Sequence, residues 1–112
     1  MDNLISFVDY NGRQIDGDVD DVMPLGDLRG KWIAFGWDVL ETNGNDMEAL
    51  LATIDQAKKR SGNGKPVMVL MHTQMGMGVD FMMGSHEWHG IAPNDEQLAR
   101  ALSQLPETLG DY

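Results

Sequence analysis

Apolar residues along the chain alternate between short strand-like runs and helix-like stripes. Residues 4–8 are apolar on both parities, and residues 66–71 form a continuous apolar run, which is typical of a strand buried on both faces. Residues 37–42 form the third strand candidate. Apolar residues at helical spacing predict three helices, with the stripes Leu25, Leu28, Trp32 and Phe35; Met47, Leu50, Leu51 and Ile54; and Leu98, Ala101, Leu102 and Leu105.

Residues at the ends of these stripes predict where the helices begin and end. Pro24 suits the first position of the first helix, and Gly36 is placed to end it. An asparagine followed three residues later by Glu or Gln is similar to a capping box. This pattern predicts the starts of the other two helices, at residues 45–48 and 94–97.

Strands that alternate with helices predict an α/β fold with parallel pairing and right-handed crossovers. A chain of 112 residues is long enough for one domain only, so we expect a single, partial domain over residues 1–112. About three parallel strands need helices on both faces, and three helices cover them incompletely. The fold is therefore expected to be part of a larger doubly wound sheet, with uncovered surface at Phe7, Val67, Val69 and Met71.

The net charge of −10 disfavours nucleic acids and anionic membrane surfaces as partners, since both require a basic footprint. The absence of cysteine excludes disulfides, thiolate metal sites and thiol nucleophiles. The first residues lack the basic and apolar regions of a signal peptide, and no run reaches eighteen apolar residues. These features predict a cytoplasmic protein.

In an open α/β sheet, ligands bind at the carboxyl ends of the strands. Asn11 and Arg13 come just beyond the first predicted strand, and residues 72–78 come just beyond the third. Both segments are thus expected on the binding edge. Taken alone, Asn11-Gly12 is also a common plain turn, and a histidine in a loop is often only a surface or capping residue.

Two segments together resemble the thiamine-diphosphate-binding domain of transketolases. They are FVDYNGRQIDG, residues 7–17, and GSHEWHGIAPND, residues 84–95, and the resemblance runs from about residue 4 to residue 112. It implies transfer of a two-carbon ketol unit between sugar phosphates, with thiamine diphosphate and Mg²⁺ as cofactors. In this family the cofactor lies between this domain and a partner pyrimidine-binding domain. The implied partner here is therefore the pyrimidine-binding transketolase subunit.

The resemblance also implies roles for individual residues. The Asn11 amide oxygen and the Arg13 carbonyl would ligate Mg²⁺, which prefers hard oxygen ligands. Ile15 would make an apolar contact to the cofactor. His89, in Trp-His-Gly-Ile-Ala-Pro, would be catalytic and cofactor-binding, because an imidazole moves protons at neutral pH and donates to phosphate oxygens. Met75 would occupy the position of an apolar residue that packs near the thiazolium.

Two departures from the family pattern bear on binding. Met75 and Met77 stand where lysine is common, so the loss of a cation is expected to weaken diphosphate binding. The Gly-Asp-Gly that opens the cofactor motif has no counterpart here, whereas the segment SQLPETLGDY resembles the end of an N-terminal transketolase subunit. We therefore expect the C-terminal part of such a subunit, inactive alone.

Two hypotheses about function follow from this expectation. In the first, a chain supplying the missing upstream strands and the pyrimidine-binding subunit complete an enzyme. In the second, the chain is a non-catalytic folded fragment that self-associates or binds a complementing chain through its sheet edge. An adjacent reading frame that ends in the missing segment would favour the first hypothesis.

Three other motifs suggest alternative sites. A cluster of methionines and histidines has the soft ligands that Cu(I) prefers, although methionine also fills irregular loops and cores. His86 and His89 have a spacing compatible with zinc, but no convincing third ligand accompanies them. Residues 62–65, Gly-Asn-Gly-Lys, are followed by Pro66 and a strand instead of a helix, which excludes a P-loop.

Overall fold

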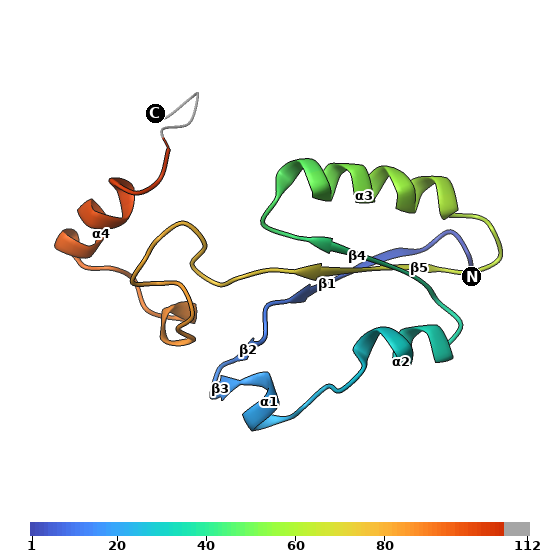
Figure 1. Ribbon diagram of the computed structural model, residues 1–112, viewed down its shortest axis with the longest axis horizontal. Helices are drawn as coiled ribbons and strands as arrows, with labels where there is room; N and C mark the ends of the chain where they lie inside the picture. The colour runs from blue at the N-terminus through green and yellow to red at the C-terminus, as the bar shows by residue number, and fades with distance from the viewer. Residues whose placement is uncertain (107–112) are drawn as a thin grey trace.

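The computed structural model describes residues 1–106, and residues 107–112 of the SQLPETLGDY segment lie outside the described residues. A three-stranded parallel sheet in the order β1–β5–β4 forms its centre (Figure 1). The strands are β1 (Ile5–Tyr10), β4 (Asp38–Asn43) and β5 (Val67–His72). The predicted α/β class, with three parallel strands and flanking helices, is therefore confirmed.

Each strand continues one or two residues beyond its predicted end. The reason is backbone pairing, since His72 pairs with Tyr10 on one side and with Asn43 on the other. Polar side chains do not interrupt this ladder, because the backbone supplies the hydrogen bonds. The apolar pattern located the strands and missed only these polar ends.

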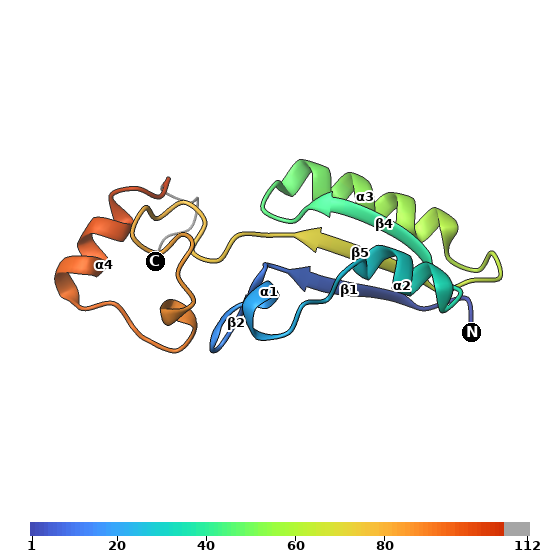
Figure 2. The same cartoon turned by 60° about the horizontal axis from the view of Figure 1, so that its bottom comes forward.

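Helices α2 (Leu28–Ala34) and α3 (Met47–Arg60) cover opposite faces of the sheet (Figures 1 and 2). Side chains of β5 alternate between these faces, as the period of a strand requires. Met68 and Leu70 pack in the cluster that Trp32 of α2 joins, whereas Val67 and Val69 pack on Ala57 of α3. The central strand is thus buried on both sides.

The expected uncovered surface is only partly where the sequence placed it. Phe7, on the edge strand β1, is 47% exposed as expected, but Val67 and Val69 are fully buried and Met71 is half-buried. The expectation was wrong for the two valines because β5 lies between the other strands and beneath α3. Two helices suffice to cover one central strand.

The helix starts show which polar residues act as caps. Helix α2 begins after Asp27, not at Pro24, because the Asp27 carboxylate accepts from the Gly30 N–H at 2.8 Å. Helix α3 begins after Asp46, not Asn45, since the Asp46 carboxylate accepts from the Ala49 N–H at 3.1 Å. The predicted capping box of α4 (Asp95–Leu102), formed by Asn94 and Gln97, is present in full.

Helix α4 lies away from the sheet, at the far end of the loop that follows β5 (Figures 1 and 2). That loop contains one short 3₁₀ helix, η1 (Glu87–His89). The radius of gyration is 17.1 Å, whereas a compact chain of this length would have about 13 Å. The predicted stripe of α4 is consequently buried only at Ala101, and its leucines are 42–61% exposed.

A small unit that the sequence did not predict follows β1. It is a two-residue hairpin of β2 (Arg13–Gln14) and β3 (Gly17–Asp18), followed by the short helix α1 (Val19–Val22). Val19 is its buried anchor, and the Val19 N–H donates to the Gly12 carbonyl at 3.0 Å. Within residues 1–106, no helix is long and apolar enough to cross a membrane.

Candidate functional site

The three strands all end on the same side of the molecule. In Figure 1 their arrowheads point toward the β2–β3 hairpin and the loop that leads to α4. The last strand residues at this edge are Tyr10, Asn43 and His72. Because ligands of open α/β sheets bind at the carboxyl ends of the strands, this edge is the candidate site.

A hollow of about 500 Å³ opens at this edge between the ends of β1 and β5 and the small unit that follows β1. The predicted residues Asn11 and Arg13 both line it, together with His72 and Thr73 of the other strand end. Three carboxylates close it from the other side, those of Asp18, Asp20 and Asp21. One guanidinium facing three carboxylates makes the hollow favourable for a cation.

Asn11 organises the turn that leads out of β1. Its Oδ1 accepts from the Arg13 N–H at 2.9 Å, and its Nδ2 donates to Asp9 Oδ2 at 3.2 Å. This side chain therefore fixes its own amide plane and the backbone two residues later, as in an Asx turn. The Arg13 side chain pairs with Asp18, which faces it across the β2–β3 hairpin.

These donors suit a hard divalent ion. The Asn11 amide oxygen and the Arg13 carbonyl are oxygen ligands that belong to one tight turn, and the acidic lining adds negative potential. Within residues 1–106, no three His, Asp or Glu side chains converge as a ready-made metal site. The residues present thus fit Mg²⁺ that is shared with ligands from a bound diphosphate.

A second hollow, of about 380 Å³, brings together the other two predicted residues. Ile15 at the tip of the hairpin lines it together with His89 from η1. His86, Glu87, Gly90 and Ile91 complete the lining. Ile15 is 74% exposed, so its side chain is available to an apolar ligand. Met75 is half-buried and lines neither hollow.

A polar chain behind the first hollow was not found by sequence reasoning. His72 Nε2 lies 2.7 Å from Glu41 Oε2, and the other oxygen of Glu41 accepts from Arg29 Nε at 3.0 Å. The Tyr10 ring packs on the His72 ring at 5.4 Å. The only signal in the sequence was the position of His72 at the end of the most apolar strand, which put it on the binding edge.

Comparisons with known proteins agree with the site. The family model of the transketolase, thiamine diphosphate binding domain, matches residues 1–107. One of the two apulose-4-phosphate transketolase subunits of Phocaeicola vulgatus is 40% identical over 112 residues, which cover 97% of this chain and 38% of that protein. The 6-deoxy-6-sulfo-D-fructose transketolase subunit SqwG of a Clostridium species is 37% identical, over 94% of this chain and 38% of that protein.

Solved structures show the same fold. A transketolase from Campylobacter jejuni superimposes with a TM-score of 0.82 at 32% identity, over 92% of this chain and 16% of that chain. A Pichia stipitis transketolase in complex with sedoheptulose-7-phosphate gives a TM-score of 0.78 at 30% identity, over 90% of this chain and 15% of that chain. The chain spans 38% of the length of the first two curated relatives.

Proposed function

The chain belongs to the transketolase thiamine-diphosphate-binding domain family, and we propose that it forms part of an enzyme that transfers a two-carbon ketol unit between sugar phosphates. The observation that carries the proposal is the meeting of distant segments at one sheet edge. Asn11 and Arg13 line one hollow there, and Ile15 and His89 line another.

Bound thiamine diphosphate supplies the nucleophilic carbon that breaks and forms the carbon–carbon bond. The residues of this chain hold and orient it. The Asn11 amide oxygen and the Arg13 carbonyl ligate Mg²⁺, and the ion draws the diphosphate into the acidic hollow. Ile15 provides an apolar wall, and Met75 extends this apolar surface where other members carry lysine.

His89 is the group that moves protons. It is exposed in the second hollow, and within residues 1–106 its ring makes no hydrogen bond, which leaves both nitrogens free for substrate or phosphate oxygens. An imidazole in this position donates a hydrogen bond in one protonation state and accepts a proton in the other. Such a general acid–base contributes typically 10²–10⁴-fold to turnover.

A partner chain is part of the proposal. The relatives from Phocaeicola vulgatus and Clostridium are named as transketolase subunits. We propose that this chain likewise works with a subunit that carries a pyrimidine-binding domain, and that these 112 residues alone bind the cofactor weakly. Asn11 and Arg13 fill only part of an octahedral Mg²⁺ shell, and the carboxylates of the hollow repel an uncompensated diphosphate.

Reconstitution tests this function. The chain would be coexpressed with the products of adjacent reading frames, and ketol transfer from a ketose phosphate to an aldose phosphate would be followed with added thiamine diphosphate and Mg²⁺. We expect activity that depends on this chain, on the partner and on both cofactors, and that falls sharply in His89→Ala. Full activity without this chain, or with His89→Ala, would refute the proposal.

A second function has one specific observation in its favour. Strands β1 and β4 each leave one edge of the described sheet unpaired, and Phe7 on β1 is 47% exposed. A non-catalytic fragment would associate through such an edge, with another copy or with a complementing chain. Sedimentation of the pure chain over a dilution series separates the two functions, since a monomer at high concentration would exclude self-association.

A further inference from the structure

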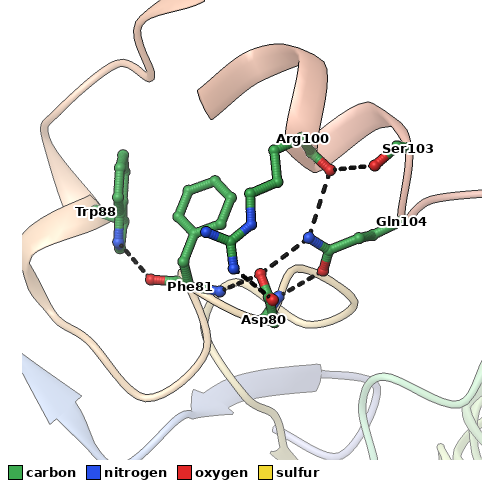
Figure 3. A network of polar contacts seen from close by, with 6 residues as sticks. All are labelled: Asp80, Phe81, Trp88, Arg100, Ser103 and Gln104. Atoms are coloured by element: carbon green, nitrogen blue, oxygen red, sulfur yellow. Dashed lines mark hydrogen bonds and ion pairs between the residues drawn. The ribbon is translucent and has the colours of Figure 1, made fainter. Parts of the chain in front are cut away.

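A polar and aromatic cluster joins α4 to the loop after β5 (Figure 3). Arg100 Nη2 donates to Asp80 Oδ2 at 2.6 Å, and Gln104 Nε2 donates to Asp80 Oδ1 at 2.9 Å. The Asp80 N–H in turn donates to Gln104 Oε1 at 2.8 Å. The hydrogen bonds from Arg100 and Gln104 lower the pKa of the Asp80 carboxyl, so this group is charged at neutral pH.

The same arginine also holds an aromatic pair. The Arg100 guanidinium carbon lies 5.0 Å from the centre of the Phe81 ring, and that ring meets the Trp88 indole edge-on at 5.4 Å. Trp88 Nε1 donates to the Phe81 carbonyl at 3.1 Å. Figure 3 shows Phe81 between Trp88 and Arg100, so displacement of the arginine frees both rings.

This cluster ends beside His89. Trp88 is half-buried and immediately precedes His89 within η1, whereas the His89 ring has no hydrogen bond of its own among the described residues. Residues 73–94 contain no regular element except η1. Long irregular loops sample several conformations unless side chains fix them. Trp88 is the neighbouring side chain that anchors this part of the loop.

We propose that Asp80, Arg100 and Gln104, acting through Phe81 and Trp88, are positioning residues that fix His89 next to Ile15. This inference rests on the proposed function of His89, and none of these five residues is placed on the substrate. An exposed ion pair alone stabilises little. Here the ion pair is joined by two amide hydrogen bonds and a cation–π contact, and all of them hold one short segment.

The first test needs no enzyme activity. In the full chain, NMR would measure water exchange of the Trp88 indole N–H and of the His89 N–H, which donates to the His86 carbonyl at 3.1 Å. Arg100→Met should accelerate both by about five- to tenfold, because it removes the cation–π contact and one hydrogen bond. Unchanged rates in Arg100→Met would overturn the proposal.

A matched variant separates this effect from general loosening. Arg60→Met removes another exposed arginine–aspartate pair, in which Arg60 Nη1 lies 3.0 Å from Asp38 Oδ1, far from the loop. It should leave both exchange rates unchanged, and an equal acceleration would overturn the proposal. Should Arg100→Met fail to fold, Trp88→Phe serves instead, since it loses only the bond to the Phe81 carbonyl and should accelerate exchange of the His89 N–H.

The second test separates positioning from structure in the reconstituted enzyme. Arg100→Met should lower kcat by about five- to tenfold with KM nearly unchanged, and should add nothing to the loss in His89→Ala. Equal losses in both backgrounds would overturn the coupling between Arg100 and His89. If the wild-type complex shows no ketol transfer, the proposed function fails by itself, and the exchange rates still decide whether the cluster holds His89.

Discussion

Replacement of Gly76 by alanine should open the loop that leads to His89, because the added methyl group has no room. Gly76 has a φ of 70°, and a Cβ at this position would lie 2.6 Å from the carbonyl carbon and from the Cβ of Met82. The left-handed conformation costs an L-residue roughly 1–2 kcal/mol. Overpacking adds about 1–3 kcal/mol, so the loop loses about 2–5 kcal/mol in all.

Amide hydrogen exchange measured by NMR checks this value locally. The Val79 N–H donates to the Gly76 carbonyl at 3.1 Å, and the Met82 N–H donates to the Val79 carbonyl at 3.0 Å. Both amides should exchange at least about 30-fold faster in Gly76→Ala, because each 1.4 kcal/mol is a factor of ten. Unchanged exchange in Gly76→Ala would refute the close approach to Met82.

Gly62→Ala is the matched control. Gly62 has a φ of 84°, but a Cβ there would meet no atom within 4 Å. This variant carries the conformational cost without the clash, and the loop amides should keep their wild-type exchange rates. If both variants changed the loop equally, the effect would come from global stability and not from the contact with Met82.

Three further outcomes are expected. His89→Ala should lower kcat of the reconstituted enzyme by about 10²–10⁴-fold, and steady-state kinetics that showed an unchanged kcat would contradict its role. Asn94→Ala should cost α4 about 1 kcal/mol through loss of the capping box, seen as faster exchange of the Gln97 N–H; equal protection would contradict this. The lowered pKa of Asp80 should keep α4 attached above its usual value of 3.8 and release it as the pH falls through the lowered pKa. A pH titration of the Trp88 indole signal checks this, and a curve unchanged by Asp80→Asn would contradict it.

Local patterns in the sequence predicted the elements whose signals are complete within a few residues. The apolar run at 66–71 identified the central strand, because burial on both faces leaves no polar position in it. The capping box of α4 was predicted because both of its members, Asn94 and Gln97, were recognised. At α3 the competing caps Asn45 and Asp46 are adjacent, and only the geometry distinguishes them.

Features that depend on distant pairing could not be predicted from the residues alone. The β2–β3 hairpin has strands of two residues, too short for any periodicity. The strand order follows from how the crossovers pack and leaves no local trace. Asp80 and Arg100 lie on a loop and a helix that the sequence placed separately, so their pairing had no signal. Ile15 and His89 were found through the family resemblance, and the fold brings them together.

Magnesium-dependent binding of thiamine diphosphate at the Asn11 turn is tested most directly by isothermal titration of the assembled two-subunit enzyme. We predict saturable binding that EDTA abolishes and that Asn11→Ala weakens at least about tenfold. Asn63→Ala is the control, since that exposed turn asparagine donates only to the Lys59 carbonyl, and it should leave binding unchanged. Binding of equal strength in Asn11→Ala, or binding that is indifferent to Mg²⁺, would contradict the proposed cofactor site.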